Sequence, residues 1–351
     1  MEKKVTYHEQ TDIDNTLKLR EVLKTLPPFC KDYFRAISAT TTTKTRISYA
    51  YDIRIFFQFL LEENPSLKNC SMEDLTVDVL DMVKALDIEE YQEYLKVYKN
   101  GEKTETNGER GLKRKISALR SFYAYYYRRE MIQTNPTVLV DVPKIHQKAI
   151  IRLDTDEVAL LLDYIEHCGD HLTGQKRVYY EKTKERDLAL VTLLLGTGIR
   201  VSECVGLDVE DIDFKNNGIK VTRKGGNEMI VYFGPEVEKA LKEYLAVREN
   251  ITPLAGHEHA LFYSTQRRRI GVQAVENLVK KYARAITTTK KITPHKLRST
   301  YGTALYQETG DIYLVADVLG HRDVNTTKKH YAALDDARRR QAASAVKLRE
   351  E

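Results

Sequence analysis

The chain has 351 residues, of which 42% are hydrophobic and 30% are charged. The composition excludes a mostly disordered protein, and the length suggests two domains, since single domains commonly have about 100–200 residues. Lysines and arginines number 56 against 51 aspartates and glutamates, and the resulting net charge of +5 permits a polyanionic partner without requiring one.

A membrane protein and a disulfide-rich protein are not expected either. The longest apolar run, Leu188–Ile199, falls short of the ~20 residues of a membrane helix, and glycines interrupt it. The polar N-terminus does not have the form of a signal peptide, so we expect a cytoplasmic protein. The cysteines form no CxxC pair, which favours reduced, mostly buried thiols over a metal site. They are Cys30, Cys70, Cys168 and Cys204.

The first part of the chain is predicted to be helical. A hydroxyl-rich run, Thr40–Arg46, supplies N-capping side chains before an apolar pattern with spacings of three and four. Helices are predicted at 14–38 (interrupted at Pro27-Pro28), 47–61, 82–98 and about 110–131.

A domain boundary is expected near residue 145. The stretch 137–150 has the character of an extended linker and contains Pro143, and a sequence like a capping box at Asp154 begins a new helix. The expected organisation is a helical domain at 1–143, a linker at 144–150 and a mixed domain at 151–351.

One β region is expected in the second domain. Three β-prone runs are separated by turns rich in Asn and Gly, which predicts three antiparallel strands. The runs are Asp211–Phe214, Gly218–Thr222 and Met229–Phe233. Helices are expected afterwards at about 235–247, 271–286, 295–308, 311–319, 325–332 and 334–349.

Several polar side chains of the second domain suit metal-free chemistry at a phosphodiester. Paired guanidiniums can hold the non-bridging oxygens, a general acid can protonate the leaving alkoxide, and a side-chain nucleophile keeps the bond energy. The candidates in chain order are Arg200, Lys224, His295, Arg298, His321 and Tyr331. Each alone is a weak signal, since a lone arginine is usually salt-bridged and the chain has 22 tyrosines. The ordered set is a much stronger one.

The order Arg, Lys, His-x-x-Arg, His, Tyr resembles the tyrosine recombinase (phage integrase) family. The segments that carry the resemblance are GTGIRVSE, TRKGGNEMIVYF, TPHKLRSTYGTAL, LGHRDVNTTKKHY and, before the linker, KRKISALRSFYAYYYRREMIQTNPT. They extend over nearly the whole chain, which is most similar to the Xer branch and, there, to the XerS type. The implied fold is mainly α with a small antiparallel β-sheet. A helical, SAM-like core-binding domain would precede an α+β catalytic domain.

The resemblance also implies roles for the candidate residues. Tyr331 would attack the scissile phosphate and form a 3′-phosphotyrosyl link that releases a 5′-hydroxyl. Arg200 and Arg298 would hold the non-bridging oxygens, and Lys224 would protonate the leaving oxygen. The sequence departs from the family in one respect. Related enzymes often place the tyrosine nine residues after the last histidine, but here that position is His330 and the tyrosine is tenth.

Three further residues complete the implied site. His295 would assist proton transfer or orient the phosphate, His321 would hydrogen-bond to it, and Glu203 would brace the site from behind. No metal and no nucleotide cofactor is implied, because the phosphotyrosine stores the bond energy.

Basic residues predict where duplex DNA would be contacted, since Lys and Arg must neutralise phosphates. They lie at one helix N-terminus, on the helix before the linker, and before the helix at about 272–284. The candidates are Thr42, Lys44, Arg46, Lys113, Arg114, Lys115, Arg120, Arg267, Arg268 and Arg269. The alternative for any one of them is a solvated basic face. The linker would let the two domains clamp opposite sides of the duplex.

Two other patterns favour ordinary structural roles. The tyrosines at 123 and 125–127 could form a base-stacking platform, but the helical periodicity favours core packing. The His257-Glu-His259 sequence could suggest a metal site, but without a third ligand nearby a plain loop is favoured.

The resemblance further implies that the amphipathic tail, 334–348, docks into a neighbouring protomer and links four subunits on two DNA sites. The favoured function is therefore Xer-like site-specific recombination, as in chromosome dimer resolution. A mobile-element integrase or excisionase, a topoisomerase-like relaxing enzyme and a non-catalytic DNA-binding protein remain as alternatives.

Overall fold

The chain was analysed as a computed structural model, in which it divides into two compact units, residues 1–148 and 149–351. The structure describes residues 6–146, 150–223, 226–321, 323 and 324. The division falls inside the stretch expected to be a linker. Among these residues, no helix is long and apolar enough to cross a membrane.

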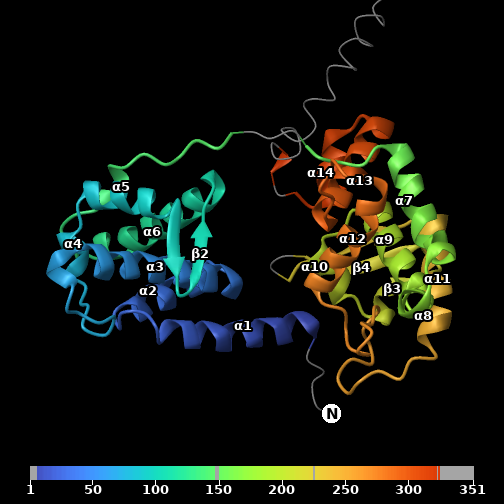
Figure 1. Ribbon diagram of the computed structural model, residues 1–351, viewed down its shortest axis with the longest axis horizontal. Helices are drawn as coiled ribbons and strands as arrows, with labels where there is room; N and C mark the ends of the chain where they lie inside the picture. The colour runs from blue at the N-terminus through green and yellow to red at the C-terminus, as the bar shows by residue number, and fades with distance from the viewer. Residues whose placement is uncertain (1–5, 147–149, 224–225, 322, 325–351) are drawn as a thin grey trace, which may run out of the picture. The chain divides into compact units, whose positions relative to one another are not determined.

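The first unit is a bundle of helices with one small hairpin (Figure 1). Its elements are α1 (Tyr7–Leu23), α2 (Cys30–Ala36), α3 (Thr43–Glu63), α4 (Val79–Met82), α5 (Ala85–Tyr94), β1 (Val97–Asn100), β2 (Lys103–Thr106) and α6 (Glu109–Tyr127). The helix α3 packs against α1, α5 and α6. Thr42 is its N-cap and accepts a hydrogen bond from the Thr45 amide, as the hydroxyl-rich run predicts.

Aromatic rings fill the core of the first unit. Phe57 of α3 and Phe122 of α6 meet edge to face with their centroids 6.0 Å apart. Tyr123 and Tyr126 are fully buried, and Tyr126 donates to the Phe29 carbonyl at 2.8 Å. Core packing is therefore confirmed for these two tyrosines, whereas Tyr127 is 48% exposed.

The hairpin β1–β2 corrects one prediction. A helix was expected at 82–98, but α5 ends at Tyr94 and the chain enters a strand at Val97. Asn100 pairs with Lys103, which leaves a two-residue turn whose first residue, Gly101, has φ 63°. Glycine at the first central position, with a positive φ, is typical of a two-residue hairpin turn of type II′.

The second unit has a buried helix, α9, at its centre (Figure 1). Its elements are α7 (Thr155–His167), α8 (Gly174–Glu181), α9 (Lys184–Thr197), α10 (Val201–Gly206), β3 (Ile212–Asp213), β4 (Gly218–Thr222), β5 (Glu228–Tyr232), α11 (Pro235–Arg248), α12 (Val272–Ile286), α13 (Pro294–Thr309) and α14 (Ile312–Leu319). The helix α9 packs against α7, α11 and α13, and most of its side chains are buried. The run that is too short to span a membrane is thus the core helix of this unit.

The predicted β region is confirmed. The three strands form an antiparallel sheet in the order β3-β4-β5, and Lys220 of β4 faces Ile230 of β5. The capping box at the start of α7 is also present, with Glu157 accepting from the Asp154 amide at 2.8 Å. Two short helices, α8 and α10, were not predicted. The helices expected at 325–332 and 334–349 lie outside the described residues.

Three of the four cysteines are buried, as predicted, and the His257–His259 sequence lies in a loop. The thiols of Cys30, Cys168 and Cys204 are buried and that of Cys70 is exposed, and all are free. His259 pairs with Glu210, and no group of three or more His, Cys, Asp or Glu side chains in the described part of the chain could hold a metal ion.

Candidate active site

Arg200 stands between two helices of the second unit and is oriented by a carboxylate. It is the N-cap residue of α10, and its amide donates to Glu203 Oε2 at 2.8 Å. The guanidinium Nη1 donates to the other oxygen of the same carboxylate at 2.7 Å. The Glu203 side chain is only 4% exposed and therefore holds Arg200 from the buried side. The Arg200 side chain itself is 37% exposed and stays accessible to a ligand.

Arg298 reaches the same place from α13. Its Nη1 donates to the Gly198 carbonyl at 2.5 Å, and its Nη2 donates to the Leu319 carbonyl. Arg200 donates through Nη2 to the next carbonyl, that of Gly320, at 3.2 Å. The two guanidiniums therefore meet at consecutive carbonyls at the end of α14.

The C-terminus of α14 is the point on which this site is assembled. Gly320 ends the helix with φ 62°, a left-handed conformation that glycine adopts without strain. The amide of His321 then donates back to the Ala316 carbonyl at 2.9 Å. The carbonyls of a last helical turn carry a partial negative charge, so guanidiniums are favourable neighbours here.

A third arginine, Arg223, joins the same helix end and was not among the predicted residues. Its Nη1 donates to the Asp317 carbonyl at 3.3 Å and its Nη2 to the Val318 carbonyl at 2.7 Å. The guanidinium lies so close to Gly320 that a Cβ on that glycine would stand 1.8 Å from Nη1. The φ of Gly320 favours glycine at this position, and a side chain there would also displace the Arg223 guanidinium.

The strand pattern contains the signal that would have found Arg223. Side chains of a strand alternate between its two faces, so Arg223 continues the face of Ile219 and Val221, which are both fully buried. A basic residue on the buried face at a strand end must have a partner, and here that partner is α14.

Of the four remaining predicted residues, the structure describes two, His295 and His321. His295 is exposed in the first turn of α13, one helical turn before Arg298, as the His-x-x-Arg spacing predicts. His321 is half-buried directly after the Gly320 cap. Lys224 and Tyr331 lie outside the described residues.

The electrostatics of the site suit an anion. Burial, together with the nearby Arg200, holds the pKa of Arg223 below its usual range, while Glu203 acts in the opposite direction. Cys204, next to Glu203, is fully buried, and this raises the pKa of its thiol to about 12, so it stays protonated and is no nucleophile at neutral pH. Converging guanidiniums of this kind can bind a phosphate through several hydrogen bonds.

Comparison with known proteins agrees with this geometry. The pattern of the Phage integrase family matches residues 152–338. The chain belongs to the phage integrase family. The curated tyrosine recombinase XerC of Caldanaerobacter subterraneus subsp. tengcongensis is 33% identical over 346 residues, covering 95% of this chain and 91% of that protein. Tyrosine recombinase XerS of Lactococcus lactis subsp. cremoris is 30% identical over 341 residues, covering 90% and 93%.

A solved structure supports the fold of this phage integrase family member. The recombinase XerH bound to palindromic difH substrate, in a post-cleavage complex, matches with a TM-score of 0.63 and 21% identity. The match covers 86% of this chain and 80% of that chain. The predicted family, enzyme class and mainly helical fold with small antiparallel sheets are thus confirmed.

The structure corrects part of the predicted DNA-contacting surface of this integrase family member. Lys115 of α6 is only 5% exposed and donates to Asp52 Oδ1 at 3.1 Å. Arg114 pairs with the other oxygen of the same buried carboxylate. Lys115 therefore lies in the core and cannot reach a phosphate, and Arg114 is held by an ion pair.

Two other predicted DNA contacts are engaged in local structure. Arg120 donates to the carbonyls of Thr137 and Val140 and so fixes the chain after α6. Arg269 pairs with Asp208 and also donates to the carbonyls of Val205 and Leu207. These guanidiniums stabilise turns, which is the structural role that a single basic residue in a sequence most often has.

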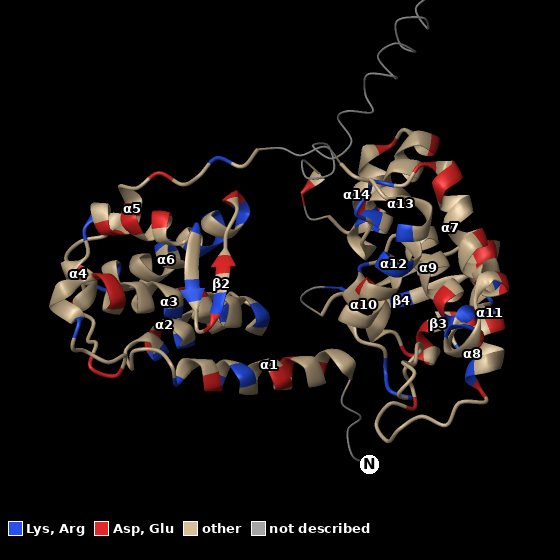
Figure 2. Ribbon diagram, viewed as in Figure 1, with Lys and Arg blue, Asp and Glu red and all other residues tan. Residues whose placement is uncertain are grey.

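The other predicted contacts stand closer to solvent. Lys44 is exposed in the first turn of α3, Arg46 is half-buried two residues later, and Lys113 is exposed on α6. Arg267 and Arg268 are exposed in the turn between Tyr263 and Arg269. Figure 2 shows Lys and Arg gathered where α10 and α12–α14 meet, and Asp and Glu along α7.

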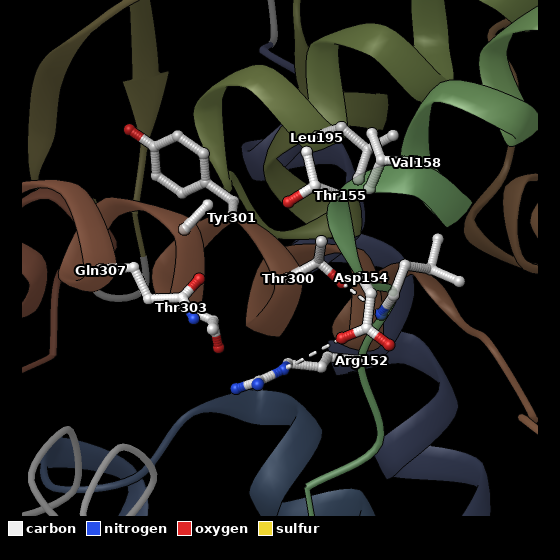
Figure 3. Close-up of a pocket in the computed structure, with 11 residues that line it drawn as sticks. Arg152, Asp154, Thr155, Val158, Leu195, Thr300, Tyr301, Thr303 and Gln307 are labelled. Carbon is white, nitrogen blue, oxygen red and sulfur yellow. Dashed lines mark hydrogen bonds and ion pairs between the residues drawn. The ribbon is translucent and has the colours of Figure 1, made fainter. Parts of the chain in front are cut away.

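A separate pocket of about 240 Å³ lies beside α13 and the start of α7 (Figure 3). It is lined by Arg152, Leu153, Asp154, Thr155, Val158, Leu195, Thr300, Tyr301, Thr303, Ala304 and Gln307. Gln307 follows Arg298 by nine residues, or two and a half helical turns, and so lies on the opposite face of α13. Tyr301, three residues after Arg298, also packs against Gly198, so the pocket borders the site on which the arginines converge.

Proposed function

We propose that the chain is a site-specific recombinase of the Xer type, which cleaves and rejoins duplex DNA through a 3′-phosphotyrosyl intermediate. The observation that carries the proposal is the convergence of Arg200 and Arg298 on the carbonyls of Leu319 and Gly320, directly before His321. Membership of the phage integrase family and the near full-length match to XerC and XerS support it.

The arginine donors are held by acceptors that a phosphate can replace. A backbone carbonyl is a neutral acceptor, whereas a non-bridging phosphate oxygen carries charge and makes the stronger hydrogen bond with a guanidinium. On DNA binding, Arg200 and Arg298 would turn their Nη2 groups from the α14 carbonyls to the scissile phosphate. Glu203 would keep hold of the Nη1 edge of Arg200, so that this guanidinium is already oriented.

The covalent step assigned to the site conserves the number of bonds to phosphorus. The phenol of Tyr331 would pass its proton to His295, its oxygen would attack the phosphorus, and the bond from phosphorus to the 5′-oxygen would break. Lys224 would give a proton to the departing 5′-oxygen, which leaves as a hydroxyl. Attack by the 5′-hydroxyl of a partner strand would reverse the step and release Tyr331.

The histidines would complete the anion site. His321 would donate a hydrogen bond to the phosphate from the end of α14. His295, exposed in the first turn of α13, would assist proton transfer or orient the phosphate. These roles place donors around the oxygens on which charge develops in the transition state, where such donors have the largest effect on rate.

The proposed partner is duplex DNA that carries specific recombination sites. Thr42, Lys44, Arg46 and Lys113 would contact it from the first unit, and the exposed Arg267 and Arg268 from the second. The N-terminus of α3, capped by Thr42, can itself bind a phosphate. The XerH structure was determined with its difH substrate, which is the precedent for this partner within the fold.

The biological role proposed is that of a Xer recombinase, such as the resolution of chromosome dimers in the cytoplasm. A tetramer on two DNA sites, held together by the tail at 334–348, is part of the same proposal. The role is chosen over that of a mobile-element recombinase because the full-length relatives are named XerC and XerS.

The proposal is tested with a nicked duplex that traps the covalent product. The wild-type protein should form a covalent protein–DNA adduct. The adduct should also form in the presence of EDTA, because guanidiniums rather than a metal ion would hold the phosphate. Tyr331→Phe should form none. Tyr301→Phe is the matched control, because it removes the hydroxyl of another tyrosine near the site. Tyr301 packs against Gly198, and burial raises the pKa of its phenol. DNA binding without any adduct in the wild-type protein would contradict the proposal.

A further inference from the structure

Arg223 links two elements of the site that are far apart in the sequence. It directly follows β4 and directly precedes Lys224, the proposed general acid. Its guanidinium donates to the carbonyls of Asp317 and Val318 in the last turn of α14. The turn that carries the acid is therefore tied at one end to the helix that presents His321.

The backbone at Arg223 is also fixed. Its amide donates to the Asn227 carbonyl at 2.7 Å, and the Gly226 amide donates to the Arg223 carbonyl at 3.0 Å. These bonds close the turn between β4 and β5. Lys224 is the next residue in the sequence and is joined by one peptide bond to this fixed backbone.

The packing leaves little freedom at the helix end. The guanidinium lies against the Cα of Gly320, where any side chain would collide with it. Arg298 takes the next carbonyl, that of Leu319, and Arg200 the one after it. Three guanidiniums from separate elements thus share consecutive carbonyls, and moving one of them disturbs the places of the others.

The position of Arg223 is electrostatically unfavourable for a residue that only stabilises a turn. Burial and the nearby Arg200 hold its pKa below the usual range for arginine. Its Nε is buried and has no hydrogen-bond partner within the described parts of the chain. A solvent-exposed turn would hold the hairpin at lower cost in desolvation.

We infer that Arg223 is a positioning residue, which fixes the β4–β5 turn on the end of α14 and so aligns Lys224 with the leaving 5′-oxygen. This inference rests on the proposed function and adds a residue to it. Arg223 itself would not touch the phosphate. Its effect on the rate would pass through the proton transfer from Lys224.

The test uses DNA in which sulfur replaces the bridging 5′-oxygen at the cleavage site. A thiolate leaves without being protonated, so cleavage of this DNA does not depend on a general acid. Single-turnover cleavage by Arg223→Ala should be slowed about 10²-fold on ordinary DNA, as expected when a catalytic group is misplaced by about 1 Å. On the sulfur-substituted DNA the variant should approach the wild-type rate, as Lys224→Ala should.

Two further variants guard against a general loss of structure. Arg223→Lys keeps the charge but lacks the planar fork of donors that spans two carbonyls, so it should show the same pattern with a smaller defect. Arg248→Ala removes a guanidinium that donates to the carbonyls of Glu258 and Ala260 away from the site, and it should cleave both substrates normally. Thermal unfolding of each variant identifies any protein that has not folded, and Arg223→Lys then decides the outcome.

The inference is overturned if Arg223→Ala and Arg223→Lys cleave both substrates at the wild-type rate. It is also overturned if they lose the same factor on both, since Arg223 would then act on the phosphate or on the fold. If the sulfur-substituted DNA does not restore cleavage by Lys224→Ala, Lys224 is not the general acid, and the inference about Arg223 is overturned with it. In each of these cases an adduct that depends on Tyr331 would leave the proposed function standing, whereas a wild-type protein without any adduct would overturn both.

Discussion

The core of the first unit and the end of α14 in the second unit hold buried cations in different ways. In the first unit, Lys115 lies in the core beside the carboxylate of Asp52, and Arg114 takes the other oxygen of that carboxylate. At the end of α14, the buried Arg298 donates to the carbonyls of Gly198 and Leu319. The first arrangement pairs opposite charges, whereas the second uses backbone carbonyls as hydrogen-bond acceptors.

This difference separates cations that stabilise the fold from cations that are available to a ligand. A lysine that leaves Asp52 would abandon a buried negative charge, which is strongly unfavourable. An arginine that leaves a carbonyl for a phosphate gains a stronger hydrogen bond. Arg200 combines both, since its Nη1 stays with Glu203 and its Nη2 rests on the Gly320 carbonyl.

Removing the carboxylate of the first unit should have the largest effect. Asp52→Ala leaves Lys115 buried without its partner, and we expect the free energy of unfolding of the first unit to fall by about 3–5 kcal/mol. Urea denaturation followed by circular dichroism measures this. The double variant Asp52→Ala/Lys115→Met should recover part of the loss, and a double variant no more stable than Asp52→Ala would mean that the pair is not coupled.

A change at the proposed phosphate-binding edge of the second unit should affect the rate more than the fold. Arg200→Lys keeps a positive charge beside Glu203 but loses the planar pair of donors. We expect adduct formation to slow by about 10²–10³-fold, as when one donor to a developing charge is removed. Single-turnover cleavage measures the rate, and thermal unfolding should remain close to that of the wild-type protein. A stable Arg200→Lys variant that cleaves at the wild-type rate would contradict the proposed role of Arg200.

Two neighbouring lysines of α6 give the smallest and most selective test. Lys113 is exposed and Lys115 is 5% exposed, although they are two residues apart. The logarithm of the DNA-binding constant should fall linearly with the logarithm of the salt concentration. Lys113→Ala should reduce the slope of this line by about one, whereas Lys115→Met should leave the slope unchanged in folded protein. Fluorescence anisotropy at several salt concentrations measures the slope. Equal changes in both variants would contradict the burial of Lys115.

The motif residues were predictable from sequence because their order and spacing are a local property of the chain. His295 and Arg298 share a helix face, and Gly320 before His321 marks the end of a helix, so simple periodicity and capping place them. The three strands and the core helix α9 were predictable for the same reason. The turn of β1–β2, with Gly101 as its first residue, carried a signal too, but it was overlooked within a helical interpretation of 82–98.

The partners of individual basic residues were not predictable from the spacing of those residues in the sequence. Arg114, Lys115 and Arg120 stand on one helix like a DNA-binding stripe, yet the first two pair with Asp52, 62 and 63 residues away in sequence. Arg223 likewise depends on carbonyls 94 and 95 residues later in the chain. Partners this distant are set by tertiary packing, which a sequence pattern does not contain.

The most direct test of the proposed chemistry is to identify the amino acid that becomes covalently linked to DNA. The adduct formed on a nicked duplex in EDTA is digested with protease and nuclease, and the linked peptide is sequenced by mass spectrometry. We expect the nucleotide on Tyr331, attached through a 3′-phosphate. A nucleotide on any other side chain, or cleavage that requires a divalent metal and leaves no linked peptide, would contradict the assignment of this site.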